Sequence, residues 1–342
     1  MSLYRVFLAS LLLLMLGGPS AAQQPTSVNP TASSVKEKQL LEALKPGSSE
    51  TVSGRVSIPD ARAGNLIQPA GADFRAFHEQ TLSRIGLIAI PGMLTLLCLF
   101  YFVRGKVPIE GGPSGQTILR FGWLSRFAHW LTATSFLALG LSGLNLVFGK
   151  SILLPVIGPN AFSGLTQLGK FVHNYVSFAF ALGIILMFVM WVRDNLPALR
   201  DIRWIAQAGG LLGIGHPPAD RFNAGQKLMF WSTVIGGATL SVSGYIMMFR
   251  PEAIALSGFQ LATIVHGVTG LVLVAIIAAH IYIGSVGMEG AFAAMGRGKV
   301  DLNWAKSHHS IWVDKVAKNR PQDISQDISQ TIAFTRAPAA AE

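Results

Sequence analysis

The chain is short of charged residues and almost free of cysteine. Only 13% of its 342 residues are Asp, Glu, Lys or Arg, and 51% are hydrophobic, whereas a soluble domain carries about 25% charged residues. The single cysteine, Cys98, excludes an internal disulfide, a thiolate-ligated iron-sulfur cluster and a cysteine-built zinc site within this chain. The chain is therefore not an ordinary soluble enzyme, and any cofactor must use other ligands.

Charged residues are missing altogether from five long runs. About 20 apolar residues in a helix cross the hydrocarbon core of a membrane, where only internally bonded backbone is tolerated. We therefore predict an all-α membrane protein with five transmembrane helices, the last starting near Gly258 or Gln260. The runs are Ile85 to Val103, Phe127 to Gly149, Phe171 to Val192, Leu228 to Phe249 and Ala253 to Met288.

The N-terminal region predicts export. An apolar core from Val6 to Leu16, followed by small residues up to Ala22, is typical of a secretory signal peptide and is about half as long as a membrane span. We expect residues 1–22 to be a signal peptide, with a retained helix as the alternative. Residues 23–80 are then an exported tail, either a disordered linker or an extended segment that lies against a partner.

The basic residues predict the orientation of the spans. The net charge of +10 does not gather in one patch or stripe, so we expect no nucleic-acid partner. The loops predicted to lie outside carry few basic residues, namely Lys150, Lys170 and Arg250, and this agrees with the rule that cytoplasmic loops are positively charged. We predict a periplasmic N-terminus and a cytoplasmic C-terminal tail, residues 291–342.

Four of the eight histidines lie within the apolar runs, where a polar ring is costly: His129, His173, His266 and His280. His266 and His280 are 280 minus 266, or 14, residues apart. That is about 21 Å and about 3.9 helical turns, so both rings leave nearly the same face of the last span. We pair the histidines by their predicted depth in the membrane. His280 pairs with His129 near the inner face, and His266 pairs with His173 near the outer face.

Each histidine pair can clamp one flat cofactor. Imidazole is a ready iron ligand, and a haem between facing helices buries its large apolar ring there. We predict that residues 120–290 form a four-helix dihaem cytochrome b bundle holding two haem b groups, and that residues 81–104 are an extra transmembrane helix. With two histidines on each iron no axial position stays open for substrate, which suits electron transfer. A haem-free membrane anchor, whose histidines only pack helices, is the alternative.

Eight glycines lie on the four predicted bundle spans. A flat macrocycle needs close approach of the backbone, but small residues are also common at helix contacts in membranes. Both explanations stay open for Gly140, Gly143, Gly183, Gly236, Gly237, Gly244, Gly267 and Gly270.

Three motifs together carry a family resemblance. The first, RFAHW at residues 126–130, opens a span; NAGQK at residues 223–227 precedes another; and WAKSHH stands at residues 304–309. With these motifs the chain resembles the gamma subunit of respiratory formate dehydrogenase, a membrane cytochrome b, over roughly residues 120–320. The NAGQK motif is the most specific of the three.

The resemblance implies a formate dehydrogenase complex of anaerobic respiration in the bacterial inner membrane. In such a complex a molybdenum or tungsten alpha subunit oxidises formate outside and an iron-sulfur beta subunit collects the electrons. The gamma subunit passes them through two haems to a quinone, either menaquinone or ubiquinone. This chain would then be surrounded by membrane lipid, and would not itself bind or oxidise formate.

The resemblance also implies roles for individual residues. By motif match, His129 and His280 would be ligands of the inner haem, and His173 and His266 of the outer haem. The same comparison suggests that Asn223 and Gln226 lie where quinone is reduced, because side-chain amides can hydrogen-bond a quinone carbonyl. The alternative for Asn223 is that it caps the helix that follows.

The chain departs from the shorter members by its signal peptide, its exported tail and its first span. These additions leave the orientation of the histidine-bearing helices unchanged, but they put in doubt how partner subunits dock. The cytochrome b subunit of a hydrogenase or of another exported oxidoreductase is the nearest rival. We expect His308 and His309 to lie in a solvated tail.

Overall fold

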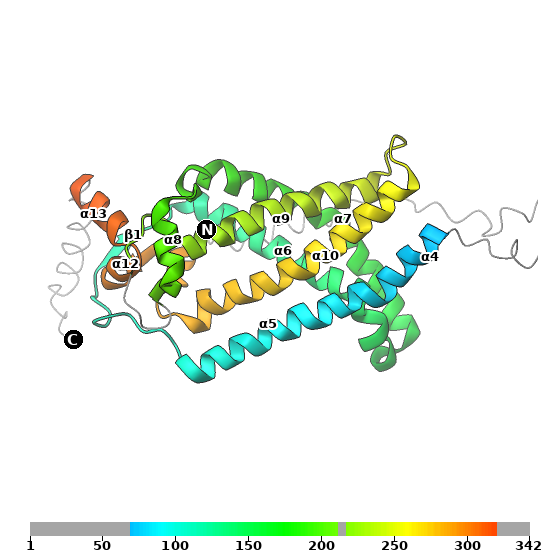
Figure 1. Ribbon diagram of the computed structural model, residues 1–342, viewed down its shortest axis with the longest axis horizontal. Helices are drawn as coiled ribbons and strands as arrows, with labels where there is room; N and C mark the ends of the chain where they lie inside the picture. The colour runs from blue at the N-terminus through cyan, green and yellow to red at the C-terminus, as the bar shows by residue number, and fades with distance from the viewer. Residues whose placement is uncertain (1–68, 211–216, 320–342) are drawn as a thin grey trace, which may run out of the picture. The chain divides into compact units, whose positions relative to one another are not determined.

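The computed structural model describes residues 69–210 and 217–319, which belong to one compact unit, Ile67–Glu342. The predicted signal peptide and nearly all of the predicted exported tail lie outside the described residues. Within the described part, five helices are long and apolar enough to cross a membrane, and they run side by side (Figure 1). The predicted fold class, all-α with five membrane spans, is confirmed.

The five spans cover the predicted apolar runs closely, although most begin earlier. Between the third and the fourth lie a short helix and two 3-10 turns, α8 (Leu199–Ala206), η2 (Arg193–Asn195) and η3 (Ala208–Gly210). A π-helical turn, η4 (Ile283–Gly287), extends the last span. The spans themselves are α5 (Leu82–Arg104), α6 (Trp123–Ile152), α7 (Leu154–Trp191), α9 (Ala224–Phe249) and α10 (Leu256–Tyr282).

The described end of the exported tail is helical, so the expectation of a linker or extended segment is wrong there. Helix α4 (Pro69–Ala76) and the π-helical turn η1 (Phe77–Thr81) lead directly into α5. An ion pair between Arg75 and Glu79, with nitrogen and oxygen 3.0 Å apart, joins neighbouring turns of this segment. Four-residue pairs of this kind support a helix that an adjacent span has already nucleated.

Helix α7 starts well before the predicted third span at Phe171. Its first turn is broken at Gly158, which has a φ of 76°, and Pro159 then restarts the helix, because its fixed φ suits a first helical position. From there the helix continues through Lys170. An apolar-run criterion stops at this charge, whereas the backbone hydrogen bonds of a helix do not.

Helices α6, α7, α9 and α10 form the bundle, and α5 packs on its outside against α10. Leu82 of α5 is 2% exposed. A Cβ added at Gly267 of α10 would come within 2.9 Å of the Leu82 side chain. The glycine thus lets the extra span approach closely while leaving the interior of the bundle to the other four helices.

One end of the bundle carries a small folded region that we call the sheet end. Strands β1 (Thr117–Leu119) and β2 (Lys299–Asp301) pair antiparallel there, with Ile118 opposite Val300. The side chains of Ile118, Val300 and Trp304 are at most 3% exposed. Helices α11 (Ala293–Gly296), α12 (Leu302–His308) and α13 (Ser310–Asn319) complete the region.

The sheet end corrects the expectation that His309 lies in a solvated tail. His309 is fully buried, at 0% exposure, and the neighbouring His308 is partly buried. No long apolar run marks this region in the sequence. Its core is assembled from short segments before α6, between α7 and α9, and after α10, which a single stretch of sequence cannot reveal.

Candidate functional site

The structure brings His129 and His280 together near the sheet end. His129 lies in the second turn of α6, and His280 lies near the C-terminal end of α10. The centres of their rings are 6.2 Å apart, with the ring planes at 55°. We call them the sheet-end pair.

The structure also brings His173 and His266 together, at a separate level of the bundle. His173 comes from α7 and His266 from the first half of α10. Their ring centres are 6.0 Å apart and their planes lie at 60°. We call them the distal pair.

Both distances suit two rings that bind one metal ion from opposite sides. A metal–imidazole bond is about 2 Å long, so two imidazole rings that both bind one metal ion would have centres up to about 6 Å apart. Within residues 69–210 and 217–319, no group of three or more His, Cys, Asp or Glu residues could hold a metal ion. Each pair thus offers two histidine donors, a set that fits a haem iron and does not fit zinc or di-iron sites.

A serine orients the ring of His173. The hydroxyl oxygen of Ser142 lies 2.9 Å from Nδ1 of His173, and the same hydroxyl donates its proton to the carbonyl oxygen of Ala138, 2.7 Å away. A hydroxyl has one proton to donate, so Ser142 accepts the proton of Nδ1. The lone pair of His173 is then on Nε2, the atom that can bind a metal.

The same arrangement recurs at His266. Its Nδ1 lies 3.1 Å from the hydroxyl oxygen of Ser243 and 3.1 Å from the carbonyl oxygen of Leu240. Ser243 donates its own proton to the carbonyl oxygen of Thr239, at 2.6 Å. Nδ1 of His266 is therefore a donor, and both rings of the distal pair present Nε2 as the free acceptor.

Each of these serines is followed by a glycine that faces the same histidine. A Cβ at Gly143 would lie 3.6 Å from Cε1 of His173, and a Cβ at Gly244 would lie 3.1 Å from Cε1 of His266. The Ser-Gly dipeptide thus combines a hydrogen-bond acceptor with space for the ring. The sequence pattern singled out the glycines but not the serines. The same dipeptide also occurs at residues 163–164 and 257–258, so Ser-Gly alone does not identify a serine that supports a histidine.

Other glycines on the spans serve helix packing. A Cβ at Gly183 would come within 2.4 Å of Thr132, and a Cβ at Gly237 within 2.7 Å of Ile184. These contacts hold α6, α7 and α9 together. Helix packing therefore explains Gly183 and Gly237, and Gly143 and Gly244 face histidine rings, while close approach to a macrocycle stays a prediction.

The sheet-end pair lacks such support from serine. Nδ1 of His129 is buried and has no hydrogen-bond partner among the described residues. A buried polar atom without a partner costs about 1–3 kcal/mol. The neighbouring Trp130 meets the His129 ring edge-on, with ring centres 5.2 Å apart. Nδ1 of His129 is thus a buried polar atom of the sheet-end pair without a described partner. This is expected where a bound group or a water molecule supplies the hydrogen bond.

Asn223 and Gln226 form a capping box at the start of α9. The side-chain oxygen of Asn223 accepts from the backbone N–H of Gln226, at 2.9 Å, and that of Gln226 accepts from the backbone N–H of Asn223, at 3.2 Å. The alternative interpretation, that Asn223 caps this helix, is confirmed. Within the part of the chain that the structure describes, the cap uses the side-chain oxygens of both residues, and neither side-chain NH₂ group donates a hydrogen bond.

Arg120 connects Gln226 to the sheet end. The guanidinium is 4% exposed, and its Nη2 lies 2.7 Å from the carbonyl oxygen of Arg221 and 3.5 Å from Oε1 of Gln226. The cation also lies 5.1 Å from the ring centre of Trp312. Burial, and next the charge of Arg221, lower the pKa of Arg120 to about 9, so the side chain is still charged at neutral pH.

His309 completes this contact as a neutral base. Its Nδ1 lies 2.8 Å from the carbonyl oxygen of Asp220 and donates to it, and its Nε2 accepts from Nη2 of Arg120 at 3.0 Å. Burial, and next the charge of Arg120, lower the pKa of His309 well below its ordinary value. His309 was expected in a solvated tail, and it is instead a buried link between α13 and the segment before α9.

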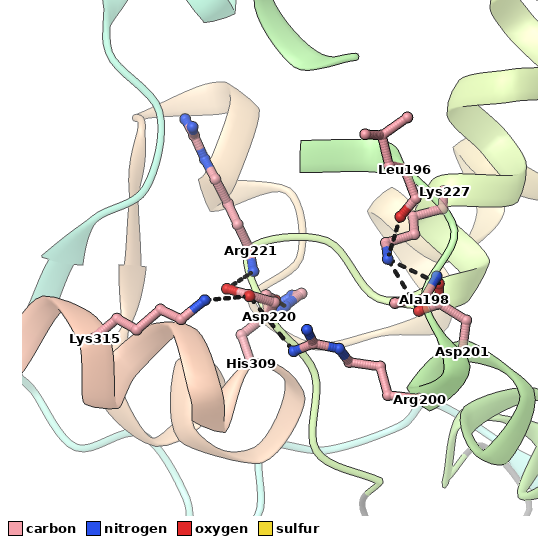
Figure 2. A network of polar contacts seen from close by, with 9 residues as sticks. All are labelled: Leu196, Ala198, Arg200, Asp201, Asp220, Arg221, Lys227, His309 and Lys315. Atoms are coloured by element: carbon pink, nitrogen blue, oxygen red, sulfur yellow. Dashed lines mark hydrogen bonds and ion pairs between the residues drawn. The ribbon is translucent and has the colours of Figure 1, made fainter. Parts of the chain in front are cut away.

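Asp220 links His309 to two more exposed basic residues (Figure 2). Its carboxylate forms ion pairs with Lys315 and, at 3.5 Å, with Arg200. Burial alone would raise the pKa of Asp220, but the hydrogen bond and charge of Lys315 outweigh it and lower the pKa. The polar contacts at this end therefore form one continuous network around the start of α9.

Comparison with known proteins agrees with the histidine geometry. The family model of prokaryotic cytochrome b561 matches residues 120–298. This range includes all four paired histidines as well as Asn223 and Gln226. The first span, α5, precedes it.

Individual relatives are cytochrome b subunits. The chain is 29% identical over 218 residues to the cytochrome b556(Fdn) subunit of the nitrate-inducible formate dehydrogenase of Escherichia coli K12, covering 62% of this chain and 97% of the relative. It is 31% identical over 208 residues to the cytochrome b556(fdo) subunit of another formate dehydrogenase of the same strain, covering 59% and 95%. A formate dehydrogenase cytochrome b556 subunit of Haemophilus influenzae is 25% identical over 225 residues, covering 64% and 92%.

Proposed function

Because the chain belongs to the prokaryotic cytochrome b561 family, and its relatives are cytochrome b subunits of formate dehydrogenases, we propose that it is the electron-carrying subunit of a formate:quinone oxidoreductase. It is a multi-pass membrane protein with five spans. The chain would not bind or oxidise formate itself. Its part is to hold and tune a redox cofactor, whose chemistry belongs to the cofactor.

The family carries b-type haem, and the proposal assigns two haems to this chain. His129 and His280 would hold one, and His173 and His266 the other, since their ring centres lie 6.2 and 6.0 Å apart. Bound haem would supply one-electron transfer between a partner subunit and quinone. The serines at positions 142 and 243 keep Nε2 of the distal histidines unprotonated and aimed by accepting from Nδ1.

The proposed quinone site lies beside Asn223 and Gln226 at the start of α9. Their side-chain oxygens are fixed by the capping box, so each amide NH₂ group points where the cap dictates and can donate to a quinone carbonyl. Arg120 holds Oε1 of Gln226 from the other side, at 3.5 Å. A quinone there would meet preset donors instead of mobile side chains.

We further propose domain limits, an orientation and partner subunits for the chain. Residues 1–22 are a signal peptide, residues 23–80 an exported tail, residues 81–104 an extra span and residues 120–290 the dihaem bundle. The N-terminus is periplasmic, and the sheet end lies on the cytoplasmic side of the inner membrane with the remainder of residues 291–342. An iron-sulfur beta subunit and a molybdenum or tungsten alpha subunit dock on the periplasmic side, near the distal pair.

The observation that carries the proposal is the presence of two histidine pairs at two levels of one bundle, each with ring centres about 6 Å apart. A pyridine haemochrome assay of the purified chain in detergent should give two b-type haems for each polypeptide. Zero or one haem would contradict the dihaem proposal, and zero would support a haem-free anchor.

The activity of the purified complex tests the proposed substrate, the quinone site and the orientation. It should reduce a quinone with formate and not with hydrogen, and turnover in proteoliposomes should move charge across the membrane. Asn223→Ala and Gln226→Ala should slow quinone reduction while formate still reduces both haems. Normal turnover in both variants would remove these residues from the quinone site, and turnover without charge movement would contradict the proposed orientation.

A further inference from the structure

The short helix α8 between the third and fourth spans has an exposed apolar face. Leu199, Ile202 and Ile205 are 88%, 67% and 64% exposed. Residues three apart on a helix point to the same side, so the three side chains form one surface. Exposed patches of large aliphatic residues are uncommon on a water-facing surface, and they mark a contact with lipid or protein.

The opposite side of α8 is fixed against the start of α9. Nζ of Lys227 lies 2.8 Å from Oδ2 of Asp201, and both side chains are mostly buried, at 10% and 14% exposure. The indole of Trp204 covers Gly225 so closely that a Cβ there would lie 2.8 Å from it. Helix α8 therefore keeps one orientation relative to the bundle.

This orientation points the apolar face away from the polar network of the sheet end. Arg200 reaches Asp220 at 3.5 Å, so the Arg200 side of α8 faces that network (Figure 2). Successive residues in a helix are about 100° apart. Ile202 is two residues further on, about 200° around the helix, and it therefore lies on the far side from Asp220.

Helix α8 lies at the depth of a membrane surface. Asp201 binds the fourth residue of α9, Lys227, and α9 is a 26-residue candidate span. A helix of this length is about 39 Å long and fills the hydrocarbon core of about 30 Å plus part of each polar interface. Its first turn is then at the level of the lipid headgroups. Figure 1 shows α8 running across the direction of the long helices at this end.

The charges beside the apolar face are positive. Arg203 is exposed and lies next to Leu199 around the helix, and Arg193 is exposed in η2, just after α7. The two acidic residues nearby are paired, Asp201 with Lys227 and Asp194 with Arg221. An apolar face flanked by arginines is the pattern of a helix that lies in the plane of a membrane, and cations there favour anionic phospholipids.

We propose that α8 is a membrane-surface helix whose apolar face, Leu199, Ile202 and Ile205, inserts among the acyl chains while Arg203 binds the phosphate of an anionic phospholipid. Asp201 and Trp204 of α8 contact Lys227 and Gly225 in the first turn of α9. A membrane surface that fixes α8 would therefore also fix this turn. That turn carries Asn223 and Gln226. The inference depends on the membrane-spanning fold and not on the assignment of haem or quinone.

The experiment uses the full chain with its one cysteine replaced, Cys98→Ala, in liposomes of phosphatidylcholine with phosphatidylglycerol. A nitroxide label is attached at Ile202→Cys. Matched labels are placed at Phe102→Cys, which is 85% exposed on α5, as a lipid-facing reference, and at exposed Lys318→Cys as a water-facing reference. Collisions with oxygen, which dissolves in lipid, are compared with collisions with a water-soluble nickel complex.

The label at position 202 should behave like the label at position 102, with oxygen collisions dominant. If it collides with the nickel complex as often as the label at position 318 does, α8 lies in water and the proposal is wrong. If neither reagent reaches it, a protein surface covers α8 and the proposal is also wrong. Leu199→Cys provides a second label on the same face in case Ile202→Cys perturbs the helix.

The lipid-charge part is tested with spin-labelled phosphatidylglycerol and phosphatidylcholine. The wild-type chain should retain phosphatidylglycerol preferentially, and Arg203→Ala should reduce that preference, by up to about fivefold for one cation at the surface. Lys318→Ala, at the position of the water-facing label, is the matched control and should leave the preference unchanged. Equal preference in wild type and Arg203→Ala would overturn the anionic-lipid contact.

Discussion

The distal and sheet-end histidine pairs have nearly the same ring spacing, yet the protein supports them differently. In the distal pair a serine fixes Nδ1 of each histidine. In the sheet-end pair Nδ1 of His129 is buried without a described partner. In the distal pair, the protein's own serines therefore orient both histidine rings. In the sheet-end pair, no described group hydrogen-bonds Nδ1 of His129.

The surroundings of the two levels differ in the same direction. Both pairs lie on spanning helices, but the sheet-end pair lies next to the sheet end, where Arg120 links Gln226 to His309. The distal pair, with both rings held by serines, suits a site that exchanges electrons with other cofactors and binds no diffusing molecule. A level beside preset amide donors suits exchange with a small diffusing molecule, which is why we place the proposed quinone there.

The largest expected effect separates the two levels. His266→Ala should remove one haem and leave the haem of the sheet-end pair, while His280→Ala should do the reverse, because each iron would lose one of two axial ligands. Haem content should fall from two to one per chain in each variant, with different components of the optical spectrum missing. Loss of the same component in both variants would contradict the pairing.

A smaller effect is expected when only the support of the distal level is removed. Ser243→Ala deletes the hydroxyl that accepts from Nδ1 of His266. Loss of such an outer partner typically weakens metal binding by about 10–100-fold. Haem retention during dilution, together with the midpoint potential of the distal haem, measures the change.

Ser241→Ala is the matched control on the same helix. Ser241 only donates to the carbonyl oxygen of Gly237, at 2.8 Å, and its removal should leave both haems unchanged. An equal effect of the two substitutions would mean that helix packing, and not the contact to His266, was lost.

The sheet end should be acid-sensitive through His309. Its pKa is lowered by burial, then by Arg120, so folding favours the neutral ring. The contribution of His309 to the free energy of unfolding is fully present above the ordinary pKa of about 6.5. It decreases as the pH drops below that value, because the unfolded chain then takes up a proton that the folded chain does not. The loss reaches about 1.4 kcal/mol for each pH unit.

Hydrogen exchange of α12 and α13 at pH 7.5 and 5.5, corrected for the intrinsic rate, measures this effect. Protection should fall at pH 5.5 in the wild type. His309→Gln can keep a donor to Asp220 and an acceptor for Arg120 but cannot titrate, so its protection should not change. The same acid response in the variant would assign it to another group.

The smallest expected effect is the loss of a helix cap. Asn223→Ala removes the side-chain acceptor for the N–H of Gln226, which costs about 1 kcal/mol at a helix N-terminus. Exchange at the first amides of α9 should become faster, and the distal haem should be unaffected. Gln167→Ala, whose side-chain NH₂ group donates to the hydroxyl oxygen of Ser163 on the same helix at 3.3 Å, serves as the control. A changed distal haem in Asn223→Ala would mean that the two levels are coupled.

Much of the histidine geometry could be predicted from spacing. His266 and His280 lie on one face of one helix because 14 residues make almost four whole turns, and the start of each span sets the depth of His129 and His173. The serines were missed because their role depends on which neighbouring helix they face. Ser142 serves α7 and Ser243 serves α10, and helix rotation in a bundle is set by packing.

The sequence by itself determined the membrane class, the five spans and the level of each histidine, because apolar length and helical period act along one continuous segment. Only the tertiary structure decided that residues 299–319 fold against the segment before α6, that His309 is buried beside Arg120, and which glycines face histidines. These features join segments far apart in the chain. They depend on how side chains from several helices fill one space, and no local pattern records that.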